Sequence, residues 1–252
     1  LNSNAVKTNT ITLNSGEITG TALDISNGSA RIKNGSVDGT ITSLGGVLEN
    51  ISNANLDVKG GRTFITNNSS LGSVNVTGGQ LWAQDEDNLS ASNTITKLTL
   101  NTSTNENSSL SDIEGLQSTP KDGLVLGLGP NKRPALTVTE KFQYDKGNVF
   151  LYAPNSIDPS KYAGNWKPLD FKTTDLSAEK YSEMFSNTYM MVEDVEGNIG
   201  YYRFNSDGSI NPLNEESQLL RPVTLRKGSL ILEVGEVDLS CLLYTSDAAD
   251  ES

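Results

Sequence analysis

The sequence predicts an all-β protein that begins with a parallel β-helix, a solenoid of stacked coils that serves as a scaffold. Three observations lead to this prediction: short runs that alternate apolar and polar residues, turn dipeptides at a regular spacing, and no helical periodicity over residues 1–110. One repeat of this size cannot bury its own apolar face, so neighbouring repeats must stack to form a continuous core.

Each repeat is a run of three to five residues that ends in a turn, as where Val74-Asn75-Val76 leads into Gly78-Gly79. The turn glycines recur at nearly equal intervals, at Gly28, Gly46, Gly61 and Gly79. Glycine and asparagine suit such corners because they adopt positive φ angles at little cost. We expect Val, Ile and Leu side chains to point inward, and Thr, Ser, Asn, Asp and Lys side chains to point outward.

A stack of β-hairpins is the competing interpretation, because Asn-Gly and Asp-Gly are good two-residue hairpin turns. Hairpins favour longer strands with aromatic pairs across them. Only Phe64 and Trp82 among the aromatic residues fall within the range 1–110. The β-helix is therefore the preferred interpretation of this region.

The composition changes between residues 103 and 122, because all eight prolines lie from Pro120 onward. We therefore divide the native chain into three parts. They are β-helix repeats over residues 1–118, a β-rich insertion or decoration with aromatic residues and prolines over residues 119–222, and a resumed β-helix rung over residues 223–240. In the second part, residues 189–195 and 199–204 are predicted to form a hairpin.

The second part also contains the one short helix that the sequence predicts, over residues 175–185. Asp175 is a suitable N-cap for this helix, and Ala178, Tyr181 and Phe185 share one of its faces.

Aromatic residues with polar tips are concentrated in the second part, at Tyr144, Tyr152, Tyr162, Trp166, Tyr189, Tyr201 and Tyr202. Such residues suit contact with a partner or a glycan. A local core for this segment is the preferred interpretation, because the segment has little other apolar mass.

The C-terminal residues 241–251 resemble the translation of a common sequencing adapter. The likeness runs from Cys241 to Glu251 and includes the one cysteine of the chain. We therefore expect residues 241–252 to be a non-native tail, and the native sequence to be cut at Ser240. The chain starts at Leu1 without a signal segment, so we expect truncation at that end as well.

The residue composition argues against several functions. Nucleic-acid binding needs clustered Lys and Arg, whereas this chain has a net charge of −12. The chain contains no histidine, which excludes Ser-His-Asp and Cys-His catalysis and the usual zinc sites. We assign no catalytic, cofactor-binding or metal-binding residue, and we expect no enzyme activity.

Two groups of acidic residues are the remaining candidates for a charged site. Asp85-Glu86-Asp87-Asn88 is the densest acidic run, but it lacks the alternating ligands, glycine bend and distal carboxylate of a calcium loop. Glu193, Asp194 and Glu196 flank the predicted hairpin turn. We interpret both groups as solvated loops.

A pair of carboxylates facing each other would instead support glycoside hydrolysis, which needs separations of ~5 to 9.5 Å. Asp24 and Asp57 satisfy this requirement if they lie on adjacent rungs of the coil. Acids arise at such positions by chance in so polar a chain, so the enzyme remains the alternative interpretation.

Several runs resemble the passenger domain of autotransporters, the type V secretion proteins of Gram-negative bacteria. The residues that carry this likeness are Thr10-Ile11-Thr12-Leu13-Asn14-Ser15-Gly16, Val74-Asn75-Val76-Thr77-Gly78-Gly79 and Lys227-Gly228-Ser229-Leu230-Ile231-Leu232-Glu233. The likeness covers residues 1–100 and 223–239, whereas the aromatic-rich residues 140–220 depart from it.

The resemblance implies a right-handed β-helix displayed outside the cell and anchored in the outer membrane by a translocator barrel that follows it. It implies adhesion or display through a host-surface, glycan or matrix ligand, with no cofactor and no membrane contact except through that barrel. Two alternatives remain open: a polysaccharide-acting β-helix of the tail-spike or lyase-like kind, and a purely structural surface-layer protein.

Overall fold

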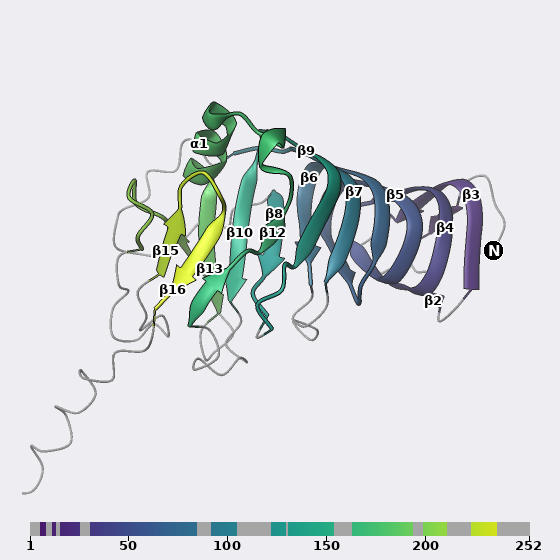
Figure 1. Cartoon of the computed structure of the whole chain (residues 1–252). Helices are drawn as coiled ribbons and strands as arrows, with labels where there is room; N and C mark the ends of the chain where they lie inside the picture. The colour runs from purple at the N-terminus through teal and green to yellow at the C-terminus, as the bar shows by residue number, and fades with distance from the viewer. Residues whose placement is uncertain are drawn as a thin grey trace, which may run out of the picture.

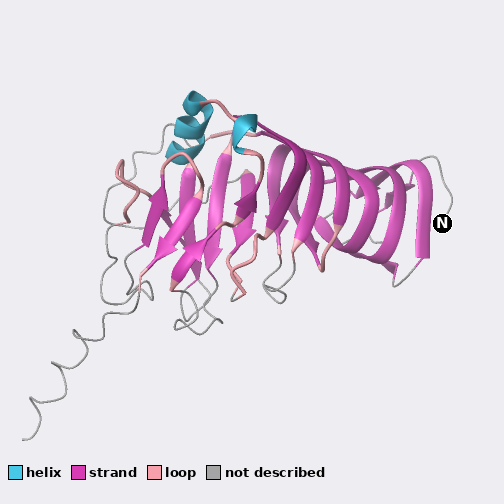
Figure 2. Cartoon of the chain, viewed as in Figure 1, coloured by secondary structure: helices cyan, strands magenta, loops and turns pink. Residues whose placement is uncertain are grey.

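The protein is mostly β, with a curled sheet, a small second sheet and one α-helix (Figures 1 and 2). The computed structural model describes residues 6–8, 12–13, 16–25, 31–84, 92–104, 122–129, 131–153, 163–193, 199–210 and 223–235. Side chains are described from Ile32 onward, Glu193 excepted. The strands of the large sheet follow one another along the molecule, starting from the N-terminus (Figure 1).

Parallel pairing dominates the N-terminal part of the large sheet. Its strands are β1 (Val6–Thr8), β2 (Thr12–Leu13), β3 (Gly16–Ile25), β4 (Arg31–Ser43), β5 (Gly46–Thr66), β6 (Ser70–Ala83) and β7 (Asn93–Asn101). Every pair among these seven strands is parallel, which argues against the hairpin interpretation for the described residues. Strands β3 to β7 are longer than the predicted runs of three to five residues, because the chain bends at its corners while it stays paired.

The register of these pairs shows that the chain returns to its own side at a nearly constant interval. Ile41 lies beside Leu56, and Leu56 in turn lies beside Val74. We call the stretch of chain from one such residue to its partner on the next strand, such as 41–56 or 56–74, a pass. The sequence intervals between these residues agree with the predicted spacing of the turns. Each pass of the chain therefore pairs with the pass before it and provides the edge for the next pass.

The large sheet continues beyond the boundary that we expected at residues 118–119. The strands that continue it are β8 (Gly123–Gly127), β9 (Leu136–Lys146), β10 (Asn148–Ala153), β12 (Leu169–Asp170) and β13 (Thr188–Glu193). β9 pairs with β7, and β8 pairs with the end of β6, both in parallel. The change in composition therefore marks wider passes of the same sheet, since the pass that starts at Asn93 returns beside it only at Leu136.

The C-terminal end of the large sheet is an antiparallel hairpin. β13 pairs in antiparallel fashion with β14 (Ile199–Arg203), which confirms the hairpin predicted for this region. A second sheet contains β11 (Gly164–Trp166), β15 (Val223–Arg226) and β16 (Ile231–Val234), all paired antiparallel. Our expectation of a resumed parallel rung here is wrong for β15 and β16, because a short strand, a glycine turn and a short strand also fit a hairpin.

The helix α1 (Ala178–Ser186) lies close to its predicted position but has a different cap. Ser177 caps it by accepting a hydrogen bond from the Lys180 backbone N–H at 3.2 Å. Asp175 belongs to the preceding 3-10 turn (Thr173–Asp175), and its carboxylate accepts from the Phe142 backbone N–H at 2.8 Å. Its predicted capping role is therefore wrong. The buried face contains Tyr181, Met184 and Phe185, whereas Ala178 is exposed.

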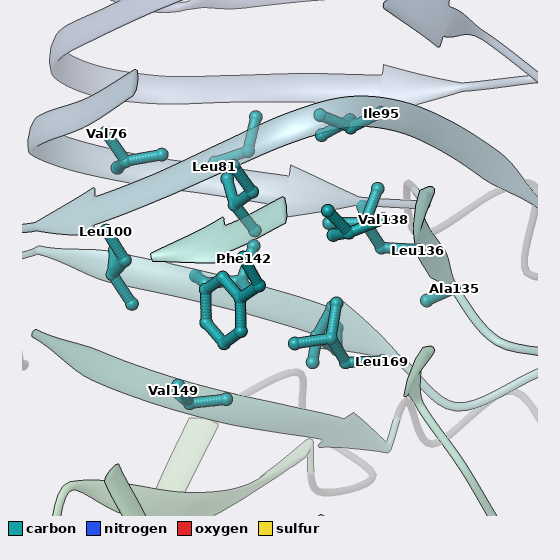
Figure 3. Close-up of a cluster of buried hydrophobic side chains, with 14 of the residues drawn as sticks. Val76, Leu81, Ile95, Leu100, Ala135, Leu136, Val138, Phe142, Val149 and Leu169 are labelled. Carbon is teal, nitrogen blue, oxygen red and sulfur yellow. The ribbon is translucent and has the colours of Figure 1, made fainter. Parts of the chain in front are cut away.

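Apolar side chains fill the inside of the curl. Side chains alternate along a strand, and parallel register brings equivalent positions together, so Val74, Leu98 and Phe142 form one inward stack. Figure 3 shows part of this core, where Phe142 lies between Leu100 and Leu169. Full burial of such a side chain contributes roughly 1.5–3 kcal/mol, so the stacked interior stabilises every pass.

A second buried cluster lies on the opposite face of the later strands. In β10, Val149 and Leu151 join the interior core, whereas Phe150 and Tyr152 belong to the second cluster. The whole cluster consists of Trp82, Val125, Phe150, Tyr152, Tyr189, Met191 and Tyr201. Its rings are in direct contact, with 5.2 Å between the centroids of Trp82 and Tyr152.

The aromatic residues of the second half thus act in packing, as the preferred interpretation expected. Tyr144, Tyr152, Trp166, Tyr189 and Tyr201 are all buried. Tyr202 is half-buried against the interior core, and Tyr162 lies outside the described residues.

The glycine turns meet at one corner of the curl. A Cβ atom on Gly79 would lie less than 3.0 Å from the carbonyl carbon of Gly60, and one on Gly61 would lie even closer to the Leu44 carbonyl oxygen. Gly61 and Gly79 have φ angles of +62° and +69°, as predicted for corner residues. The passes therefore approach so closely here that no side chain fits. Gly28, the first predicted turn, lies outside the described residues.

Replacement of Gly79 by alanine should test this close approach. Gly79→Ala should lower the free energy of unfolding by more than ~4 kcal/mol, because the new methyl group overlaps the previous pass. Gly228→Ala is the matched control, because Gly228 has a φ of +90° but nothing within 4 Å of its Cβ position. This control should lose only about 1–2 kcal/mol from backbone strain. Equal losses in urea unfolding would contradict the corner contact.

A second prediction concerns alkaline stability. Burial raises the pKa of Tyr144 from 10.0 to about 12. The folded state then holds this proton more tightly than the unfolded state, so its contribution to stability is complete below pH 10 and is lost as the pH rises from 10 to about 12. Tyr144→Phe should show a smaller loss of stability over this interval, measured by urea unfolding at several pH values.

The loss should not vanish in that variant, because burial also raises the pKa of Tyr181 and Tyr201. An unchanged slope between pH 10 and about 12 in Tyr144→Phe would show that Tyr144 ionises normally in the folded protein.

Candidate functional site

A polar groove lies on the outer face of the large sheet, across β6, β7 and β9. Its volume is about 270 Å³. Its lining consists of Ser73, Asn75, Lys97, Leu98, Thr99, Lys141 and Gln143. We call this feature the outer groove.

Strand alternation and parallel register together build the outer groove. Leu98 points into the core, so its neighbours Lys97 and Thr99 point outward. Register then places outward residues of successive strands side by side. One column contains Ser73, Lys97 and Lys141, and the other contains Asn75, Thr99 and Gln143. The first column therefore offers a hydroxyl and two ammonium groups, and the second offers a hydroxyl and two amide groups.

Hydrogen bonds fix the end of the groove that lies nearest to β5. The Asn75 side-chain amide donates to the Asp57 carboxylate at 2.9 Å. The Ser73 backbone N–H donates to the Asn55 side-chain oxygen at 2.8 Å. These bonds hold the polar groups of β5 and β6 in place before any ligand arrives.

Two lysines dominate the charge of the outer groove. Lys97 and Lys141 are direct neighbours on adjacent parallel strands, which lie ~4.8 Å apart. Lys97 Nζ is 3.6 Å from a Glu140 carboxylate oxygen, and both side chains are more than half exposed. Among the described residues, no carboxylate forms an ion pair with the Lys141 ammonium group. The groove thus presents a cationic spot in a chain of net charge −12.

Another charged group on this sheet is better enclosed. Glu49 is only 7% exposed, and its carboxylate lies 2.9 Å from the Lys33 ammonium group. The Asn67 side-chain amide donates to the same carboxylate oxygen. This arrangement ties three successive passes together, which indicates a structural role.

The two carboxylates considered for glycoside hydrolysis do not lie on adjacent strands. Asp24 pairs with Thr42, and Thr42 pairs with Asp57, so a whole strand separates the two acids. Two strand spacings amount to about 9.6 Å, at the outer limit for such a pair. The condition of adjacent rungs is therefore not met, because the first passes are shorter than the distance between these residues in the sequence.

Most of the other acidic candidates lie outside the described residues. The run Asp85-Glu86-Asp87-Asn88 lies outside the described residues, as do Asp194 and Glu196. Glu193 ends β13, and its side chain is not described. Within the described parts of the chain, no group of three or more Cys, Asp or Glu residues is placed to hold a metal ion. No helix in those parts is long and apolar enough to cross a membrane.

The outer groove itself was not predicted from the sequence. Lys97 and Lys141 are far apart in the sequence, and their contact depends on a register that crosses a long insertion. A partial signal exists, because each lysine directly precedes a residue that points into the core, Leu98 or Phe142. This shared position would have placed both lysines on the outer face, but not side by side.

Comparisons of this chain with protein families, with curated proteins and with solved structures return no significant match. The chemistry of the outer groove must therefore be interpreted from its own residues.

Glu49 and Glu140 each pair with a lysine of the large sheet, but they should differ in their effect on stability. Glu49→Ala should lower the free energy of unfolding by about 1–3 kcal/mol, because it removes a nearly buried carboxylate that accepts from the Asn67 amide and pairs with Lys33. Glu140→Ala should change it by less than about 0.5 kcal/mol, because its pair with Lys97 is long and exposed. Urea unfolding of both variants measures the difference, and similar losses would contradict the structural role of Glu49.

Proposed function

We propose that this chain is part of a surface-displayed β-helical protein that acts in adhesion or display, by binding a ligand along its outer face and without catalysis. The observation that carries the proposal is the stacking of polar side chains in register on the outer groove, above a continuous apolar interior. A surface of this kind repeats its hydrogen-bonding groups at the strand spacing, which suits an extended ligand.

The proposed architecture is a right-handed parallel β-helix, as in the autotransporter passengers that the repeats resemble. Successive parallel partners, such as Ile41, Leu56 and Val74, recur at similar intervals, which supports a coil of nearly constant size in the N-terminal half. The proposal includes an extracellular location and an outer-membrane anchor in the intact protein. The acidic net charge is compatible with a soluble domain outside the cell.

The chemistry of the outer groove favours binding over hydrolysis. Its lining contains ammonium, amide and hydroxyl groups and no carboxylate. Hydrolysis of a glycoside requires two carboxylates, one on each side of the scissile bond. The groups present hold a ligand through hydrogen bonds and charge, which is sufficient for adhesion.

A lyase-like enzyme remains the second candidate because of one specific observation. The lysine pair of the outer groove offers positive charge that would stabilise the negative charge that develops on a uronate carboxylate during β-elimination. In that reaction a base takes the proton next to the carboxylate and the glycosidic C–O bond breaks. The leaving sugar takes up a proton, and the other chain end is left as an unsaturated sugar.

An experiment that measures binding and turnover together separates these functions. The purified chain should bind one or more immobilised glycans or matrix proteins saturably, and it should release neither reducing ends nor unsaturated sugars from them. Release of unsaturated ends would replace adhesion by the lyase, and release of reducing ends would replace it by a hydrolase. Binding to none of these surfaces would overturn adhesion in favour of a purely structural role.

A further inference from the structure

The most distinctive chemistry of the described surface is the lysine pair of the outer groove. Both ammonium groups project from directly neighbouring strand positions. Like charges at this distance repel each other, so an anion placed between them would relieve the repulsion. Glu140 neutralises Lys97 only weakly, because exposed ion pairs of this kind are strongly screened by solvent. A ligand carboxylate can therefore compete for both lysines.

The remaining groups of the groove are suited to sugar hydroxyls. Ser73 and Thr99 offer hydroxyl groups that both donate and accept hydrogen bonds. The Asn75 and Gln143 amides donate one N–H to Asp57 and Asp145, at 2.9 and 3.0 Å, and keep an oxygen and a second N–H. These groups lie in two columns that run across three strands. The groove volume of about 270 Å³ is slightly below that of pockets for drug-sized ligands. A short stretch of a saccharide chain fits such a groove.

We propose that the outer groove binds a uronate-containing polysaccharide, with one sugar carboxylate between Lys97 and Lys141 and with neighbouring hydroxyls on Asn75, Thr99 and Gln143. This inference rests on the proposed function, because it names the ligand class of the outer face. The ligand binds without chemical change.

The charge distribution favours a uronate over a more highly charged polymer. A duplex nucleic acid carries one charge per ~1.7 Å, which is denser than a polysaccharide with one carboxylate per sugar, so it would meet stronger repulsion from a chain with net charge −12. Asp57 lies beyond one end of the groove, hydrogen-bonded to Asn75, and Glu140 lies beside Lys97. A uronate needs only one cationic spot for each carboxylate, and its uncharged hydroxyls tolerate the surrounding acids.

The test measures binding of polygalacturonate to the purified chain by calorimetry at low salt, with neutral dextran and dextran sulphate as comparison ligands. Polygalacturonate should bind and dextran should not. The double variant Lys97→Gln/Lys141→Gln should weaken binding at least tenfold. Lys97→Arg/Lys141→Arg should retain binding, because it keeps both charges. Added sodium chloride should weaken the binding of the unmodified chain, because the lysine contacts are exposed.

The matched control is Lys59→Gln/Lys172→Gln, which removes two exposed lysines that do not line the groove. It produces the same change in net charge, and its affinity should stay within twofold of the unmodified chain. Equal losses in the two glutamine double variants would mean that only net charge matters, and would overturn the proposal. Unchanged binding in Lys97→Gln/Lys141→Gln, or tighter binding of dextran sulphate than of polygalacturonate, would also overturn it.

The outcome also separates this inference from the proposed function. If the chain binds another glycan or a matrix protein but not polygalacturonate, the uronate site is wrong and adhesion stands. If it binds no ligand of any kind, both are wrong.

Discussion

The structure depends on the parallel pairing of each pass of the chain with the pass before it. This pairing satisfies the backbone hydrogen bonds of the long strands, and it also decides where every side chain lies. Because the register is kept, apolar residues stack inward, as do Val74, Leu98 and Phe142. The same register forces outward residues into columns. The glycine corner maintains the pairing, since Gly61 and Gly79 leave room for backbones that almost touch.

The pairing determines which residues lie side by side on neighbouring strands, but it does not determine how many residues separate them in the sequence. The early passes are short, as between Ile41 and Leu56, whereas the pass from Asn93 to Leu136 is more than twice as long. Longer loops add little entropic cost, so insertions at the corners are tolerated. Buried polar groups hold the wider passes in place. The Asn93 side-chain amide donates to the Ile65 carbonyl at 3.0 Å, and its oxygen accepts from the Ser69 N–H at 3.0 Å.

The period of the first passes could be predicted because each turn there is local in the sequence. Gly46, Gly61 and Gly79 mark corners that the chain reaches after similar distances. Beyond residue 100 the insertions hide this period, so a continued sheet resembles a separate segment. For residues 223–234 the local pattern is visible but ambiguous. A short strand, a glycine turn and a short strand fit both an antiparallel hairpin, which the structure has, and a parallel coil, which we predicted. The outer groove depends on a pairing between Lys97 and Lys141 that no local pattern encodes.

The interior and the outer face place different demands on the sequence. An inward position must be apolar and of suitable size, since a change there affects neighbouring passes as well. An outward position such as Lys97 or Gln143 faces solvent, so many polar residues would satisfy the fold there. Lys97 and Lys141 lie side by side in one column and repel each other, and the exposed pair of Lys97 with Glu140 offsets this repulsion only weakly. Such repulsion is expected where a surface serves binding, which is the role that we propose for the outer groove.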